Sequence, residues 1–214
     1  MNKSIPHNIK YAKKFRNLLI NINRDLFLVR EKMEELKKSA SYYNDEDEEQ
    51  YDELHYLVMA LEDRRFLEHC GVDWRSVIRE LKNWLMGKKH GGASTIDMQM
   101  VRTITGFKDR TVYRKIYEAC LAFIVNFKFS KKEIIDCYLN NAFFGSHIYG
   151  INSAIQKCYE KKYIADLNLD EKAQLAAMLQ IPRPLNPSEK WVEKILERAS
   201  YAQFVWRSMK NSND

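Results

Sequence analysis

Acidic, basic and histidine side chains gather in one stretch of the chain, residues 61–74. Such side chains transfer protons in many enzymes, although a helix end with several salt bridges has the same composition. Just before this stretch, apolar residues recur at helical spacing on one face, namely Leu54, Leu57, Val58 and Leu61. The pattern predicts a helix that becomes polar from Glu62 onward and ends at Gly71. Glycine suits this end because it tolerates the left-handed conformation of a helix terminus.

A second stretch places glycines before the start of a helix. Gly91 and Gly92 precede Ser94 and Thr95, either of which can cap a helix. Free backbone N–H groups and the helix dipole favour an anion at such a start. The Gly-Lys-Ser/Thr sequence of a nucleotide-binding loop is missing. Taken alone, the stretch is more typical of an ordinary capped helix.

A third stretch combines two cations with a carboxylate. Arg114 and Lys115 precede Glu118 by four and three residues, so all three share one helix face. A surface ion pair of this kind contributes only a few tenths of a kcal/mol. Residues 119–125 are apolar on every side, however, which predicts a buried helix and places Glu118 between a dry core and the cations. Such a carboxylate is a candidate functional group, with a structural ion network as the alternative.

These stretches resemble three signatures of the peptidoglycan glycosyltransferases, glycosyltransferase family 51. The first signature, Glu-Asp-x-x-Phe-x-x-His-x-Gly-x-Asp, is matched by Glu62, Asp63, Phe66, His69, Gly71 and Asp73. The second, Gly-Ala-Ser-Thr-x-x-x-Gln-x-x-Lys-Asn, is matched by Gly92, Ala93, Ser94, Thr95 and Gln99. Arg102 replaces its lysine with the charge kept, and Thr103 replaces its asparagine. The third, Arg-Lys-x-x-Glu-Ala, is matched by Arg114, Lys115, Glu118 and Ala119.

Further matching blocks extend the resemblance, in collinear order, over roughly residues 54–205. One departure lies after Tyr159, where Glu160 and Lys161 follow instead of the usual Phe-Gly-Lys, so the loop there is expected to differ in shape. Two more segments have the form of helix starts with capping boxes, at Ser130 and at Asn168.

The resemblance implies a polymerase of lipid II that forms β-1,4-linked glycan strands, inverts the donor linkage and releases polyprenyl diphosphate. It makes Glu62 the base and Glu118 a second carboxylate, near the diphosphate or holding a divalent cation (Mg or Mn); no organic cofactor is implied. Positive charge for the diphosphate would come from Arg102, Arg114 and Lys115. The other residues implied to bind substrate or shape the site are Asp63, Phe66, His69, Ser94, Thr95 and Gln99.

Other functions stay open. A lytic lysozyme-like hydrolase would fit the fold but has no diphosphate for the cationic residues to hold. A catalytically divergent relative could bind lipid II as a regulator or secreted effector. The net charge of +6 and pI near 9.0 are compatible with any anionic partner, but the chain lacks the interleaved basic and aromatic pattern of single-strand binders, so no nucleic acid is expected.

The resemblance also implies an all-α, lysozyme-like fold with a larger head lobe and a smaller membrane-facing jaw lobe. We expect a basic amphipathic arm and acidic linker in residues 1–50, with a helix over about 10–38, and the glycosyltransferase domain in 51–214. Helices are expected over 74–86, from Ser94 and over 110–129. A last helix should pack through a stripe of residues, Trp191, Ile195, Ala199, Ala202 and Trp206.

Cysteines and apolar runs constrain the compartment. Cys120 and Cys137 are expected in the core, and the cysteine spacing predicts neither disulfides nor a zinc site. No signal peptide or apolar run near the roughly 20 residues of a membrane span is found. The family acts on the outer face of the cytoplasmic membrane, so we expect peripheral attachment, truncation or export by another route. Partners would be lipid II, the growing glycan strand, the membrane surface and cell-wall synthesis proteins. Residues 84–86, flanked by lysines, predict either shallow membrane insertion or a core-facing helix end.

Overall fold

The computed structural model describes residues 7–41, 50–88, 92–107 and 111–211, and the regular secondary structure of this part of the chain is almost entirely helical. The helices are α1 His7–Ser41, α2 Glu53–Glu62, α3 Trp74–Leu85, α4 Ile96–Thr105, α5 Val112–Asn126, α6 Lys131–Asn141, α7 Ile151–Tyr159, α8 Leu169–Met178 and α9 Glu189–Asn211. The predicted all-α, lysozyme-like fold is therefore confirmed. One small antiparallel hairpin, β1 Phe143–Gly145 with β2 Ile148–Tyr149, was not expected.

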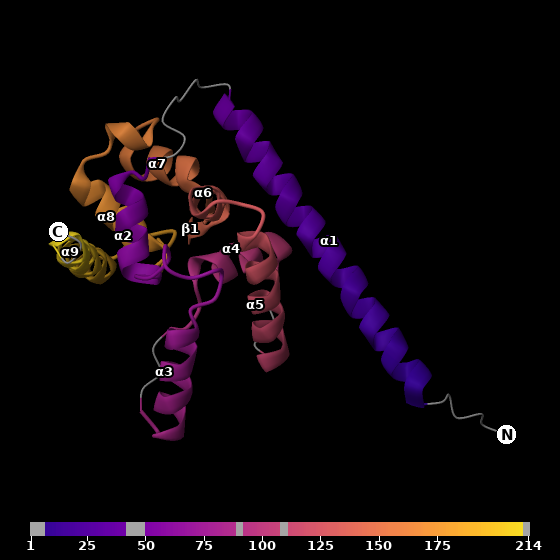
Figure 1. Cartoon of the computed structure of the whole chain (residues 1–214). Coiled ribbons are helices and arrows are strands. Elements are labelled where there is room, and N and C mark those ends of the chain that lie inside the picture. Colours follow the sequence, from indigo (N-terminus) through magenta and orange to yellow (C-terminus); the bar gives the residue numbers. More distant parts are fainter. Residues whose placement is uncertain (1–6, 42–49, 89–91, 108–110, 212–214) are drawn as a thin grey trace.

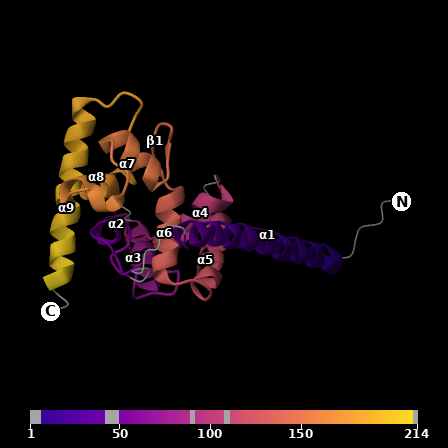
Figure 2. The same cartoon turned by 90° about the horizontal axis from the view of Figure 1, so that it is seen from above.

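The helices pack in two connected groups. On one side α2 contacts α8 and α9, and in the centre α4 contacts both α5 and α6. Figure 1 shows α1 running along the outer side of the central group, opposite α9. The view from above confirms that α1 and α9 lie on opposite sides (Figure 2). Helix α3 and the far end of α5 project away from this body.

Local capping signals define several helix starts. The Ser130 hydroxyl accepts from the Glu133 N–H at 3.2 Å, and the Glu133 carboxylate accepts from the Ser130 N–H at 2.7 Å. Asn168 forms the same reciprocal box at the start of α8. Both predicted capping boxes are confirmed. The stripe predicted on α9 is confirmed as well, with Ile195, Ala199 and Ala202 buried and both tryptophans packed against the core.

Helix α1 is docked on the central group by both apolar and polar contacts. Val29 and Met33 are buried in the core. The buried Asp25 carboxylate accepts a hydrogen bond from the Tyr117 hydroxyl of α5 at 2.8 Å. The helix predicted in the N-terminal arm is thus confirmed, while the domain boundary at residue 50 stays a prediction.

The predicted closure of the second helix at Gly71 is wrong. Helix α2 ends at Glu62, because Asp63 leaves the helical conformation and turns its carboxylate toward the start of α4. Gly71 closes the following loop instead, with φ of +85°. A Cβ at Gly71 would lie 2.6 Å from the Ala122 carbonyl oxygen, so the loop can rest on α5 only if residue 71 has no side chain.

Helix α5 is less buried than its apolar sequence predicts. Tyr117, Leu121 and Val125 face the core, but the opposite face is exposed at Ile116, Cys120, Phe123 and Phe127. The core position expected for Cys120 is therefore wrong, whereas Cys137 is buried as predicted. Only one face of α5 packs against α4 and α1. Within the described residues, no helix combines the length and apolar character that crossing a membrane requires.

The contact between Gly71 and α5 predicts a large effect of one methyl group. We expect Gly71→Ala to lower the free energy of unfolding by more than about 2 kcal/mol, because both the positive φ and the Ala122 carbonyl oppose a Cβ. Gly87 is a matched control, since it also has positive φ (+64°) but has no atom within 4 Å of the added Cβ. Gly87→Ala should cost about 1 kcal/mol. Denaturant unfolding of the three proteins measures the difference, and equal losses would contradict the packing argument.

Candidate active site

Glu62, the last residue of α2, is held by a side chain from α4. The Gln99 amide nitrogen donates to Glu62 Oε2 at 2.7 Å, and the Tyr138 hydroxyl of α6 donates to Gln99 Oε1 at 2.9 Å. Glu62 is partly exposed and Tyr138 is buried. The carboxylate therefore sits at the surface end of a hydrogen-bonded chain that runs into the core.

Asp63 joins the first sequence signature to the second. Its buried carboxylate oxygen Oδ2 lies 2.9 Å from His69 Nε2 and accepts from the Ile96 N–H at 3.2 Å. A second link runs the other way, because the Thr95 hydroxyl donates to the Gly71 carbonyl at 2.7 Å. Thr95 also accepts from the Met98 N–H as the cap of α4. These bonds fix the loop after Glu62 against the start of α4.

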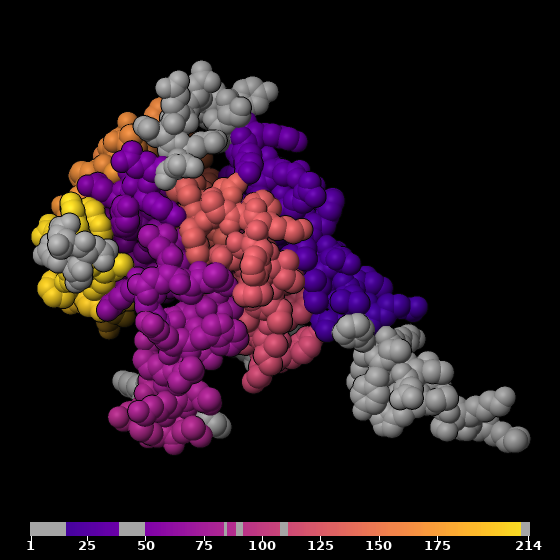
Figure 3. Space-filling view, viewed as in Figure 1, coloured from indigo at the N-terminus to yellow at the C-terminus, as the bar shows by residue number. Residues whose placement is uncertain are grey.

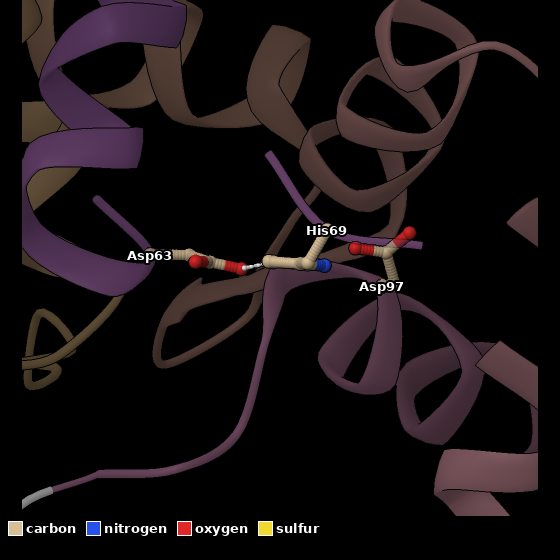
Figure 4. Close-up of side chains that lie close together, drawn as sticks. All are labelled: Asp63, His69 and Asp97. Atoms are coloured by element: carbon tan, nitrogen blue, oxygen red, sulfur yellow. Dashed lines mark hydrogen bonds and ion pairs between the residues drawn. The ribbon is translucent and has the colours of Figure 1, made fainter. Parts of the chain in front are cut away.

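Asp63, His69 and Asp97 bring a possible set of metal ligands within 4.8 Å of one another. Figure 4 shows the His69 ring between the two carboxylates, with one edge bonded to Asp63 and the other nitrogen facing Asp97. The Asp63 oxygen beside the ring is already bonded to His69 Nε2 and to the Ile96 N–H. Asp97 already has a cation, because Lys131 Nζ lies 3.0 and 3.1 Å from its two oxygens. We therefore interpret this row as a structural ion network.

Asp97 is fully buried, and its surroundings shift the pKa of its carboxyl in opposite directions. Burial raises the pKa of the Asp97 carboxyl above its ordinary value of 3.8, while Lys131 and the Asn126 amide lower it. Asn126 donates to Asp97 at 2.7 Å. The Lys131 ammonium also lies 4.4 Å from the centroid of the Phe66 ring. Lys131 thus neutralises the carboxylate and packs on a residue of the first signature.

Cations surround the second candidate carboxylate, Glu118, which is almost completely buried. Arg114 Nε lies 3.2 Å and Lys115 Nζ 3.9 Å from its oxygens. The Lys115 ammonium also donates to the Ser94 hydroxyl just before α4. Desolvation lowers the pKa of Lys115; the charge of Glu118 opposes this shift, and the nearby charges of Arg102 and Arg114 add to it. This cationic cluster, defined as Arg102, Arg114 and Lys115, carries more positive charge than one carboxylate neutralises.

The structure gathers the residues expected from the sequence into two adjoining sets. Glu62 and Gln99 form the first, while Arg114 and Lys115 pair with Glu118 in the second, with Ser94 and Arg102 close to Lys115. The other expected residues lie beneath these sets. Phe66 is fully buried, Thr95 is 2% exposed, and Asp63 and His69 are bonded to each other. In this structure these residues support the site from inside.

Three residues of the site were not singled out by the sequence, namely Asp97, Lys131 and Tyr138. Asp97 and Lys131 are separated by 34 positions and become partners only when α4 and α6 pack together. Tyr138 lies among the buried apolar residues of α6, where a tyrosine ordinarily packs. The one local signal was an acidic residue in the first turn of a helix, since Asp97 lies two residues after the cap Thr95.

The Asp97–Lys131 pair predicts a pH-dependent loss of stability. Because the pKa of folded Asp97 is raised, the free energy of unfolding falls as pH rises from the unfolded value of 3.8 toward the folded value. Lys131→Met removes the main group that lowers this pKa. The pKa of folded Asp97 then rises further, and the pH range over which the free energy of unfolding falls becomes wider. We expect a loss of about 3–5 kcal/mol near about pH 7 and a much smaller loss near about pH 4.

Lys132→Met is the matched control, since Lys132 pairs with Asp136, whose side chain is 35% exposed. Its loss should stay below about 1 kcal/mol and depend little on pH. Denaturant unfolding at both pH values provides the measurement. A pH-independent loss for Lys131→Met would contradict the proposed charge balance.

Comparison with known proteins supports the resemblance over most of the chain. A family model described as Transglycosylase matches residues 31–209. Penicillin-binding protein 1A of Aquifex aeolicus is 39% identical over 130 residues, which are 60% of this chain and 18% of that protein. Penicillin-binding protein 1A of Rickettsia felis is 34% identical over 147 residues, 67% of this chain and 18% of that protein. Penicillin-binding protein 1F of Bacillus subtilis is 38% identical over 130 residues, 60% and 18% respectively.

The chain spans less than a fifth of the length of these relatives, each being covered to 18%. The family match begins at residue 31, inside α1, and so includes the buried Met33. It ends at residue 209, inside α9, and thereby takes in both groups of helices. With the matched residues, the helical fold and the signature residues in agreement, the chain belongs to the transglycosylase family, glycosyltransferase family 51.

Proposed function

We propose that the protein is a peptidoglycan glycosyltransferase that polymerises lipid II into β-1,4-linked glycan strands with inversion and release of polyprenyl diphosphate. One observation carries the proposal. Helix α4 holds Glu62 through Gln99 and, three residues later, places Arg102 near Lys115. Three residues of helix span about 4.5 Å. A candidate base and a cationic cluster are therefore close enough to act on one glycosidic linkage.

The reaction needs a base on one side of the donor sugar and positive charge on the other. Glu62 would take the proton of the acceptor 4-hydroxyl while that oxygen forms a bond to the donor anomeric carbon. The bond from this carbon to the diphosphate oxygen breaks at the same time. Attack opposite the leaving group converts the α linkage to a β linkage. The cationic cluster would neutralise the charge that develops on the diphosphate.

A divalent cation, Mg or Mn, belongs to the same proposal. Glu118 would contribute one carboxylate, whose Oε1 accepts no hydrogen bond in the described part of the chain but lies 3.2 Å from Arg114 Nε. Magnesium takes about six oxygen ligands, so most of them would come from the diphosphate and water. The ion would supply further positive charge at the leaving group. No organic cofactor is needed for this chemistry.

A membrane surface is the proposed location, because lipid II is a lipid. Helix α3 exposes one apolar stripe, Trp74, Ile78, Leu81 and Leu85, and Met86 after it is exposed too. The core-facing alternative for residues 84–86 is therefore excluded at Leu85 and Met86. Figure 3 shows α3 projecting beyond the body. An exposed apolar helix face flanked by basic residues favours binding at a bilayer interface.

The relatives are named as penicillin-binding proteins, and we place the protein with them at the outer face of the cytoplasmic membrane, acting on lipid II and the growing strand. Cell-wall synthesis proteins are the proposed protein partners. A lytic hydrolase would leave the cationic cluster without a role. A divergent lipid II binder would not need Glu62 to be held by Gln99.

The proposal predicts that Glu62→Gln abolishes polymerisation. Removing the base should lower the turnover number on labelled lipid II by about 10²–10⁴-fold, while the fold persists. Glu68→Gln is the control, because Glu68 is an exposed carboxylate in the same loop, and it should retain activity. The wild type should form glycan polymer with a divalent cation, lose activity with a chelator, and be blocked by moenomycin. Full activity of Glu62→Gln, or no polymer from the wild type, would refute the mechanism.

The exposed stripe on α3 predicts binding to lipid vesicles. Replacing Ile78 and Leu85 together by glutamate should weaken binding to anionic vesicles by about tenfold or more, since two apolar contacts become charged. Phe204→Glu is the control, because Phe204 is 68% exposed but lies on α9. Vesicle flotation measures the three proteins. Equal binding of both variants would show that α3 is not the membrane contact.

A further inference from the structure

Tyr138 is a buried tyrosine whose hydroxyl is directed at the site instead of at solvent. The residue is 5% exposed and donates from α6 to Gln99 Oε1 at 2.9 Å. Burial raises the pKa of Tyr138 well above its ordinary value of 10, and the nearby charge of Glu62 raises it further, against an opposing effect of Arg102. The hydroxyl therefore stays protonated and can donate to Gln99 Oε1.

The Tyr138 hydroxyl anchors the oxygen end of the Gln99 amide. An amide has an oxygen that only accepts and a nitrogen that only donates. With Oε1 bound to the Tyr138 hydroxyl, Nε2 must face the other way, toward Glu62 Oε2 at 2.7 Å. The reversed amide would set its oxygen against the Glu62 carboxylate. The Glu62 carboxylate only accepts and the Tyr138 hydroxyl donates here, so the two together hold the amide in the orientation that binds the charged form of Glu62.

The same face of α6 has a second polar contact with α4. Lys131 lies seven residues before Tyr138, two helical turns away on the same face, and pairs with Asp97. Helix α6 thereby reaches α4 through Lys131 at one end and through Tyr138 at the other. Since α4 and α6 also share an extensive packed interface, the Tyr138 hydroxyl is held in a rigid frame.

We propose that Tyr138 is a positioning residue, which acts through Gln99 to hold Glu62 Oε2 so that Oε1 is free to receive a proton. Among the described residues, the one hydrogen bond to the Glu62 carboxylate goes to Oε2 and none reaches Oε1. The inference rests on the proposed function, because it assigns Glu62 the role of base. In the reaction the acceptor hydroxyl proton moves to Oε1 while the bond from Gln99 to Oε2 persists. Tyr138 itself neither gains nor loses a proton.

A cycle of variants separates this role from simple packing. Tyr138→Phe should lower kcat about tenfold and leave the KM for lipid II within about twofold, because the base is misaligned while substrate contacts persist. In a Gln99→Ala background the same change should have almost no further effect on kcat. Tyr159→Phe is the control, since the Tyr159 hydroxyl also bonds within a partly buried environment but on α7, away from the site. It should leave kcat unchanged.

Additive losses of kcat for Tyr138→Phe and Gln99→Ala, or an unchanged kcat in Tyr138→Phe, would overturn the positioning role. Denaturant unfolding checks that every variant is folded and tests the contact without turnover: the two substitutions should be non-additive there too. If the wild type polymerises lipid II but Tyr138→Phe keeps the wild-type kcat, this inference alone is lost. If the wild type forms no polymer, the proposed function is lost, and with it the base that Tyr138 would position.

Discussion

The buried carboxylate of Asp63 is the constraint on which the rest of the site depends. It ends helix α2 directly after Glu62 and binds both His69 and the first N–H of α4. The far end of the loop after Glu62 is held at the start of α4 as well, because the Thr95 hydroxyl donates to the Gly71 carbonyl. A buried charge is tolerated only when it is paired and hydrogen-bonded. Glu62 consequently has little freedom, because its neighbour is bonded on both sides.

Helix α4 carries several residues of the site, and their positions follow from where its start is held. Its start is fixed by Asp63, and its next turns carry Asp97, Gln99 and Arg102. Asp97 and Gln99 are each held by α6, through Lys131 and Tyr138. The two members of the cationic cluster on α5, Arg114 and Lys115, are linked to the start of α4 by the bond of Lys115 to Ser94. Contacts from α5 and α6 therefore fix the first turns of α4, which favours a preorganised site over an adaptable one.

Sequence patterns predicted what is local and missed what is long-range. The capping boxes at Ser130 and Asn168 depend on residues three positions apart, so they could be read directly. The end of α2 could not, because Asp63 is drawn to a partner 33 positions away. Cys120 was misplaced because an apolar helix looks the same whether its outer face is covered by protein or left exposed. Tyr138 and Lys131 were missed because both act only across the α4–α6 interface.

A crystal structure with a donor analogue and an acceptor bound together would test the central claim most directly. The account predicts the acceptor 4-hydroxyl oxygen about 2.6–3.2 Å from the Glu62 carboxylate. It also predicts the diphosphate oxygens of the donor in contact with Arg102, Arg114 or Lys115. A diphosphate bound away from this cluster, or an acceptor hydroxyl that faces a different base, would contradict the account.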